Sequence, residues 1–304
     1  MIYTVTLSPS VDYIMHVDQF HEGELNRASK TFYYAGGKGI NVSRVLKRLD
    51  IKNTALGYIG GFTGRFIEEY LESEQVQHQF IETEYPTRVN VKLKSDEESE
   101  INGPGPDISE DQQNQLLKQV DQLQPDDYLV VAGSIPKTIP ATFYKEMAKL
   151  CEQNNAHFIA DTSGQALEEL VGLRTFLLKP NHHELGELYN TSIETQEDAI
   201  TYARKLVDQG AEHVIVSMGG QGAIFVSKDH TYSCNVPKGT VKNSVGAGDS
   251  VVSGFLASYS QNKDLSQAFK QGVAAGSATA FSNDLGTKED IEKLLSEIEV
   301  QEHA

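Results

Sequence analysis

The stretch "KNSVGAGDSVVSG" (residues 242–254) joins a glycine-rich turn to the start of an apolar helix. Gly246 and Gly248 permit backbone conformations that other residues avoid, and they let a neighbouring group approach closely. Beyond Asp249, apolar residues recur at helical spacing, at Val251, Val252, Phe255, Leu256 and Tyr259. The start of a helix carries unpaired N–H groups and a positive dipole end, so it attracts anions. A carboxylate placed there is either a helix cap or a group with a chemical role beside a bound anion.

The rest of the chain alternates short β-branched runs with helical patterns. Strands are predicted at 2–7, 54–60, 128–133, 157–161, 175–180 and 213–220. Helices are predicted at 38–49, 63–74, 140–153, 164–171, 182–189 and 194–209. This alternation predicts an α/β fold with a mostly parallel sheet and helices on both faces. Sites in such folds gather at the carboxyl ends of the strands.

One region, "PTRVNVKLKSDEESEI" (86–101), breaks the alternation with a strict period of two. One face of this strand is apolar, with Val89, Val91 and Leu93, and the other is polar, with Arg88, Asn90, Lys92 and Lys94. Segment 14–34 also has the pattern of short strands. We therefore expect a small antiparallel sheet, built from 12–34 and 86–104, outside the main sheet.

Net charge, cysteine content and the length of apolar runs limit which kinds of protein this chain can be. The 304 residues carry a formal net charge of −17, which disfavours nucleic acid or an anionic membrane as a partner. An anionic substrate would need a locally basic site. Two cysteines, Cys151 and Cys234, are too few for a disulfide framework and are expected to be buried thiols. The start "MIYTVTLSPSVD" has no signal-peptide pattern, and no apolar run is long enough to span a bilayer, so a cytoplasmic protein is expected.

The motif "AGGKGINVSR" (35–44) is glycine-rich and opens a helix. It is not a Walker A loop, because Gly39 follows Lys38 where Ser or Thr belongs. Lys38 can supply a positive charge to a phosphate, and Asn41 can donate to a hydroxyl group. The alternative is an ordinary strand-to-helix turn with an exposed lysine.

Two further motifs leave structural and functional interpretations open. In "KPNHHEL" (179–185), Asn181 and Glu184 are one helical turn apart and could serve one magnesium or phosphate site, or form a capping box. The glycines of "VSMGGQGAIF" (216–225) could make a tight hairpin or lie under a nucleotide. A dinucleotide fingerprint fails in "GAGDSV", since Val251 stands where a third glycine or alanine belongs.

Together, "GGKGINVSR" and "NSVGAGDSVVSG" resemble the two signatures of the PfkB carbohydrate kinases, also called ribokinase-like. "TLSPSVD" and "KPNHHEL" fall where that family has matching pieces, so the resemblance covers essentially the whole chain. Val245 departs from it, at a position where threonine is common. The resemblance implies one kinase domain over residues 1–304, a three-layer α/β sandwich with a mostly parallel sheet and a small antiparallel β lid. It also implies phosphoryl transfer from ATP to a sugar.

The resemblance assigns roles to individual residues. Asp249 would be the general base for the sugar hydroxyl, and the N–H groups of Gly246, Ala247 and Gly248 would form an anion hole for the γ-phosphoryl group. The helix dipole is expected to keep Asp249 ionised. Residues implied in substrate binding are Asp12, Gly37, Lys38, Asn41, Arg88, Asn90 and Lys92. Asn181, Ser217, Gly219, Gly222 and Gly248 would bind ATP, Glu184 would hold Mg²⁺ through water, and the small residues of 274–281 would leave room for adenine.

Lys38, Arg88 and Lys92 converge in an acidic chain, which favours a substrate that already carries a phosphate. The motifs look most like those of 1-phosphofructokinases, which convert fructose 1-phosphate to fructose 1,6-bisphosphate. Tagatose-6-phosphate kinase stays as the alternative, and a regulator without catalysis as a remote one. We also expect a homodimer joined through the apolar lid face, unless 14–34 covers that face within one chain.

Overall fold

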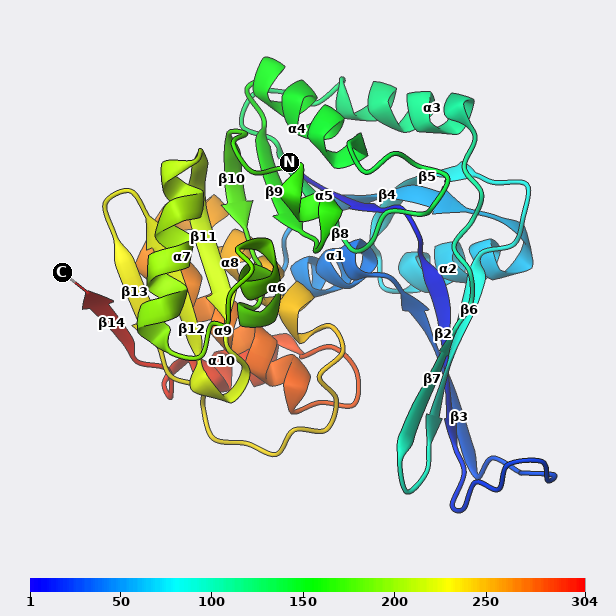
Figure 1. Cartoon of the computed structure of the whole chain (residues 1–304). Coiled ribbons are helices and arrows are strands. Elements are labelled where there is room, and N and C mark those ends of the chain that lie inside the picture. Colours follow the sequence, from blue (N-terminus) through cyan, green and yellow to red (C-terminus); the bar gives the residue numbers. More distant parts are fainter. Residues whose placement is uncertain (304) are drawn as a thin grey trace.

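The large sheet forms the centre of the molecule (Figure 1). The structure is a computed structural model and describes residues 1–303. The strand order of the large sheet is β14-β13-β12-β11-β10-β9-β8-β1-β4-β5. The pairings from β5 to β11 are parallel and those from β11 to β14 are antiparallel, which confirms the mostly parallel sheet. These strands are β1 (Ile2–Thr6), β4 (Asn53–Ile59), β5 (Gln77–Glu82), β8 (Tyr128–Ala132), β9 (His157–Asp161), β10 (Thr175–Leu178), β11 (Ala211–Ser217), β12 (Ala223–Ser227), β13 (Thr231–Cys234) and β14 (Val300–His303).

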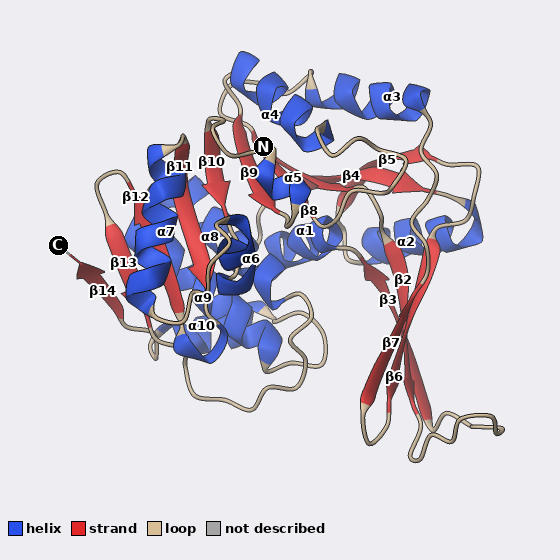
Figure 2. Ribbon diagram, viewed as in Figure 1, coloured by secondary structure: helices blue, strands red, loops and turns tan. Residues whose placement is uncertain are grey.

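Helices cover both faces of this sheet (Figure 2). One layer contains α1 (Lys38–Arg48), α2 (Gly61–Ser73), α8 (Ala247–Asn262), α9 (Leu265–Ala280) and α10 (Lys288–Leu295). The other contains α3 (Glu110–Val120), α4 (Phe143–Gln153), α5 (Gln165–Glu168), α6 (His182–Leu188) and α7 (Gln196–Asp208). In β8, Leu129 packs into one layer and Val130 into the other, so the strand is apolar throughout its length. The free thiols of Cys151 and Cys234 are buried in these layers, as predicted.

Helices α8 and α9 pack closely because small residues face each other. A Cβ added to Gly276 would lie 2.6 Å from Cγ2 of Val251 and 3.0 Å from the carbonyl oxygen of Ala247. Ala274, Ala275 and Ala278 are almost fully buried in the same layer. The small residues of 274–281 are therefore explained by helix packing, and they do not need adenine as their reason.

The second sheet consists of β2 (Ser10–His16), β3 (Lys30–Gly36), β6 (Arg88–Lys94) and β7 (Glu98–Asn102), in the order β3-β2-β6-β7. It stands away from the main body (Figure 1). Its strands begin and end close to the bounds of the predicted segments, 12–34 and 86–104. Its two outer pairings are antiparallel, as expected. The central β2–β6 pairing is parallel, because a long excursion through β4, α2 and β5 separates the two strands in sequence.

Burial in this small sheet is inverted relative to an ordinary amphipathic sheet. On its inner face Asn90 and Lys92 are only 8% and 7% exposed, whereas Ile101 on the outer face is 67% exposed. Near the main body the outer face is covered, since Val11 and Ala35 pack with Ile67 and Leu71 of α2. We expected that only segment 14–34 could cover this face within one chain. That expectation was wrong for the part of the sheet nearest the main body, which α2 covers. Farther out the apolar side chains are open.

Within residues 1–303, no helix combines the length and the apolar character that crossing a membrane would require.

Candidate active site

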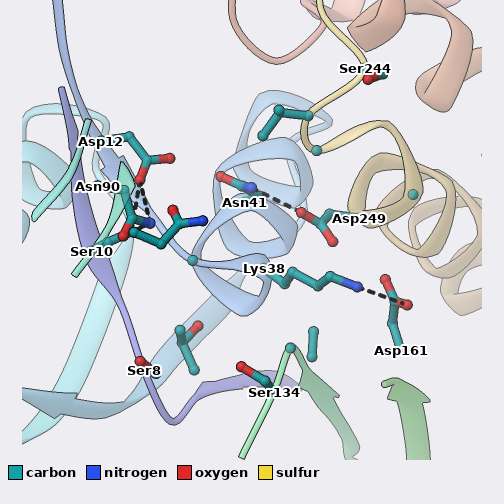
Figure 3. A pocket seen from close by; sticks show the side chains of 18 of the residues that line it. Ser8, Ser10, Asp12, Lys38, Asn41, Asn90, Ser134, Asp161, Ser244 and Asp249 are labelled. Carbon is teal, nitrogen blue, oxygen red and sulfur yellow. Dashed lines mark hydrogen bonds and ion pairs between the residues drawn. The ribbon is translucent and has the colours of Figure 1, made fainter. Parts of the chain in front are cut away.

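A cavity of about 500 Å³ lies at the carboxyl ends of the parallel strands, between the small sheet and the start of α8 (Figure 3). It brings together most of the predicted site residues: Asp12, Gly37, Lys38, Asn41, Arg88, Asn90, Lys92, Asn181, Glu184, Ser217, Gly246, Gly248 and Asp249. These come from segments far apart in sequence. Below, the part beside the start of α8 is called the helix end, and the part beneath β2 and β6 is called the small-sheet end.

Asp249 is the third residue of α8 and is 3% exposed. Asn41 of α1 donates from Nδ2 to its Oδ2 over 2.9 Å, and Figure 3 shows the two side chains pointing at each other. Burial, together with the negative charge of Asp161, raises the pKa of Asp249 to about 7. The N-cap of α8 is Gly246 and no side chain caps this helix, so Asp249 is not the cap. The positive end of α8 was expected to favour the ionised form, whereas burial and Asp161 act in the opposite direction.

The turn that begins α8 supplies the backbone groups of the helix end. Gly246 is the N-cap, with φ 79°, in the left-handed region that favours glycine. Gly246 and Gly248 both line the cavity. The cavity lining does not include Ala247, whose N–H donates to the carbonyl oxygen of Ser244 over a long 3.3 Å. The structure therefore places two of the three predicted anion-hole residues in the site.

A buried carboxylate joins two lysines at this end. Asp161, 1% exposed, lies 3.2 Å from Nζ of Lys179 and 3.5 Å from Nζ of Lys38, measured from Oδ1. Burial opposes ionisation, but the charges of Lys179 and Lys38 lower the pKa of Asp161. Burial likewise opposes the charge of Lys38, yet Asp161, Asp249 and Glu184 raise its pKa. Lys38 was expected beside the substrate's own phosphate, but its ammonium group points to Asp161 instead (Figure 3).

The sequence assigns no site role to Lys179, and it places Asp161 only at a strand's carboxyl end, where sites are expected. Asp161 is the last residue of β9, in "HFIAD", and Lys179 follows β10, in "TFLLKP". The two strands are parallel neighbours. A charged residue at the carboxyl end of a parallel strand is the signal that could have identified them. Ser134 and Ser244 also line the cavity without having been predicted.

Polar side chains at the small-sheet end form a network across β2 and β6. Oδ1 of Asp12 accepts from Oγ of Ser10 over 2.7 Å and from Nδ2 of Asn90 over 3.3 Å. Nδ2 of Asn90 also donates to Oγ of Ser10 over 3.0 Å. Nζ of Lys92 lies 3.8 Å from carboxylate oxygens of both Asp12 and Glu100, too far for strong hydrogen bonds.

Arg88 has no carboxylate within 4.0 Å in the described part of the chain. Its guanidinium donates only to the carbonyl oxygens of Gly103, over 3.3 Å, and Ser8, over 3.1 Å. Burial lowers the pKa of Arg88, while Asp12 acts in the opposite direction. Its Nε is buried without a partner, as is Oδ1 of Asn90 beside it. A partly buried arginine without an ion pair is suited to bind an anion.

Asn181 and Glu184 confirm the structural interpretation of their motif, and their place in the cavity leaves the magnesium interpretation as a prediction. They form a capping box at the start of α6, with Glu184 N–H donating to Asn181 Oδ1 over 2.9 Å and Asn181 N–H donating to Glu184 Oε2 over 2.8 Å. Both residues also line the cavity. The cap holds Glu184 through one oxygen and leaves its other oxygen free of the box.

The glycines of the 216–225 motif make a hairpin between β11 and β12, as the structural interpretation predicted. A Cβ at Gly222 would collide with the carbonyl oxygen of Cys234, so close packing explains this glycine. A Cβ at Gly219 would meet open space. Ser217 lines the cavity, but Gly219 and Gly222 are not part of its lining.

The chain is similar to known proteins along nearly its whole length. 1-Phosphofructokinase of Bacillus subtilis is 53% identical over 300 residues, covering 99% of each chain. D-Tagatose-1-phosphate kinase of Bacillus licheniformis is 35% identical over 301 residues, again covering 99% of each chain. The structure of phosphofructokinase-2 from Escherichia coli in complex with fructose-6-phosphate matches with a TM-score of 0.91 at 30% identity, covering 97% of this chain and 98% of that one. The family described as pfkB family carbohydrate kinase matches residues 5–292, and the chain belongs to that family.

Proposed function

We propose that this kinase transfers the γ-phosphoryl group of ATP to fructose 1-phosphate and forms fructose 1,6-bisphosphate. One observation carries the proposal. A single cavity holds a buried carboxylate at the open start of a helix, Asp249, and an arginine without an ion pair, Arg88. The first suits the activation of a hydroxyl group, and the second suits a phosphate already on the substrate.

At the helix end, Asp249 takes the proton from the acceptor hydroxyl as its oxygen attacks the γ-phosphorus, and ADP leaves. A pKa of about 7 lets this carboxylate be ionised at neutral pH and still accept a proton readily. The N–H groups of Gly246 and Gly248 face the phosphoryl group in transit, with the positive end of α8 behind them. Lys38 and Lys179 add positive charge where the transferring oxygens gather, as phosphoryl transfer needs.

The residues beside α6 fit a hydrated Mg²⁺ that accompanies ATP. Mg²⁺ keeps several waters and binds one or two carboxylates together with substrate phosphates. Glu184 has one oxygen outside its capping box, and Oδ2 of Asp161 is buried without a partner. Glu184 would hold the ion, with Asn181 orienting it through the capping box. When bound, Mg²⁺ neutralises charge on the phosphates. Ser217 and Gly219 would border the nucleotide.

At the small-sheet end, Arg88 would bind the phosphate that the substrate brings. Lys92 is available as a second cation, because its contacts with Asp12 and Glu100 are long. Asp12 and Asn90 would then bind sugar hydroxyls between the two ends. Two cations at this end of the cavity would attract a sugar phosphate that the net charge of −17 would otherwise repel.

The identity of the ketose remains a choice between two epimers. The Bacillus subtilis relative is named for fructose phosphate, and the Bacillus licheniformis relative is named for D-tagatose 1-phosphate. The alternative function is therefore a tagatose phosphate kinase. The test is a coupled ADP-release assay with fructose 1-phosphate, fructose 6-phosphate, tagatose 1-phosphate and tagatose 6-phosphate. We expect the highest kcat/KM with fructose 1-phosphate. A preference for another of the four would replace the substrate, and no turnover with any would contradict the kinase function.

The small sheet would act as a lid, and its outer face would pair two copies of the chain. Ile101, Tyr33 and Val89 are 67%, 52% and 38% exposed on that face. Exposed apolar side chains grouped on one sheet face are typical of an interface, and a twofold axis would cover both copies at once. The need for ATP and the two free thiols fit the cytoplasm as its location.

A further inference from the structure

A chain of buried hydroxyl groups runs behind the turn that begins α8. Oγ of Ser250 donates to the carbonyl oxygen of Gly246 over 2.9 Å. Oγ of Ser250 also lies 2.7 Å from Oγ1 of Thr279 in α9, and the N–H of Gly286 donates to Oγ1 of Thr279 over 2.9 Å. Ser250 and Thr279 are 0% and 1% exposed, so water does not compete for these bonds.

The hydrogen bonds through Ser250 and Thr279, called the hydroxyl relay below, all point in one direction. A hydroxyl group has one hydrogen to donate. Ser250 uses its hydrogen on the carbonyl of Gly246, so the hydrogen between the two hydroxyls must come from Thr279. Thr279 in turn accepts from the N–H of Gly286. The bonds therefore run from Gly286 through Thr279 and Ser250 to Gly246, and aligned bonds of this kind strengthen one another.

The far end of the relay is held by two arginines of α1. Arg44, 1% exposed, binds Asp284 with two hydrogen bonds of 3.2 and 2.7 Å and also binds Glu74, 2.8 Å from Nε. Arg48 donates to the same Asp284 over 2.9 Å and to the carbonyl oxygen of Leu285. The segment 284–286 is thus attached to α1 by its side chains and by its backbone.

The same segment also touches the turn directly. A Cβ added to Gly246 would lie 2.7 Å from Cδ2 of Leu285, so Leu285 packs against the backbone of this glycine. Gly246 has no side chain with which to cap α8. The hydroxyl relay and Leu285 supply from outside the anchoring that a capping side chain would supply from within.

We propose that Ser250 and Thr279 are positioning residues for the anion-binding turn Gly246–Gly248, and that the segment 284–286, held by Arg44, is their anchor. This inference rests on the function proposed above for the N–H groups of Gly246 and Gly248. The carbonyl of Gly246 accepts from both the N–H and the Oγ of Ser250, each over 2.9 Å. Two bonds to one carbonyl restrict the peptide plane between Gly246 and Ala247. This peptide lies in the middle of the turn, so fixing it limits how far the flanking N–H groups of Gly246 and Gly248 can reorient.

The test is to remove one hydroxyl while keeping the side-chain shape. Thr279→Val breaks the relay and is expected to lower kcat about tenfold to a hundredfold, as small displacements of catalytic groups do. KM for ATP and for the sugar phosphate should stay unchanged, because neither residue touches a substrate. Thr279→Ser, which keeps the hydroxyl, should restore most of the kcat.

A matched control is available in the other buried hydroxyl pair. Thr4 and Ser43 are both 0% exposed and their oxygens lie 2.7 Å apart, away from the turn. Thr4→Val should lower the melting temperature as much as Thr279→Val does and leave kcat unchanged. Equal kcat in the two valine variants, or no rescue by Thr279→Ser, would overturn the inference. Absence of turnover with any of the four sugar phosphates in the wild-type protein would instead contradict the proposed function, so the two failures can be told apart.

Discussion

The two ends of the cavity are built in different ways. At the helix end, Asp249, Asp161 and Lys179 are each at most 4% exposed and are carried by α8 and by the carboxyl ends of β9 and β10. At the small-sheet end, Arg88 and Asp12 are half-buried on a sheet that packs on the main body only at its base. Among the described residues, Asp161 at the helix end is paired with two lysines, and of these charged groups only Oδ2 of Asp161 is left without a partner. Within the same residues, the small-sheet end has an arginine without an ion pair and unpartnered atoms on both Arg88 and Asn90, which a ligand could satisfy. We therefore expect the helix end to control kcat and the small-sheet end to control substrate affinity.

The strongest test of this contrast is Asp249→Asn, which keeps the shape of the side chain and removes the base. Loss of a general base typically lowers the rate by about 10²–10⁴-fold, and we expect kcat to fall by that amount. Equilibrium binding of ATP, measured by calorimetry, should persist. Asp229→Asn, at an exposed residue between β12 and β13, is the control. A variant that kept more than half of the wild-type kcat would remove Asp249 from the mechanism.

The second test compares one cation from each end. Arg88→Ala should raise KM for the sugar phosphate by roughly ten- to a hundredfold, since charged hydrogen bonds contribute about 1.5–3 kcal/mol, and should leave KM for ATP unchanged. Lys38→Ala should mainly lower kcat, because its ammonium group lies 3.5 Å from Asp161 at the helix end.

Steady-state kinetics with each substrate varied in turn would separate the two effects. If both variants raised KM for the sugar phosphate and spared kcat, Lys38 would belong to the small-sheet end, as the sequence first indicated. Equal effects of Arg88→Ala on both substrates would mean that this pocket is misassigned.

A third test uses pH. Burial and the charge of Asp161 raise the pKa of Asp249 to about 7, and a base acts only when deprotonated. As pH falls below that value, kcat/KM should fall about tenfold per pH unit. Asn41→Ala removes a hydrogen bond that favours the charged carboxylate, so the acid limb should move to higher pH. A wild-type profile that stayed flat down to the ordinary range of carboxyl groups would contradict this account of Asp249.

Several of these features could be predicted from sequence because they are local. The period of two in 88–94 identified both faces of β6, and glycine beside an apolar helix identified the start of α8. Contacts between distant segments could not be predicted this way. The pairing of Arg44 with Asp284 joins residues 240 positions apart, and Asp161 meets Lys38 only because β9 and α1 converge at one sheet edge. The raised pKa of Asp249 could not be predicted from the sequence either, since it depends on burial and on the charge of Asp161.

The last test, with the smallest expected effect on activity, concerns the outer face of the small sheet, whose inner face forms the small-sheet end of the cavity. The inner face of β6 is buried in the site, and its apolar outer face is open beyond the part that α2 covers. Val91 lies on that face, paired with Ile101 of β7.

A second copy covering this face would stiffen the sheet, and a charge placed there would lose its hydration on pairing. Light scattering at micromolar concentration should therefore show a dimer for the wild type and a shift towards monomer for Val91→Asp. Because the helix end is built without this sheet, the variant should keep most of its kcat and lose affinity for the sugar phosphate. A wild-type monomer with full activity would show that the open face has another role.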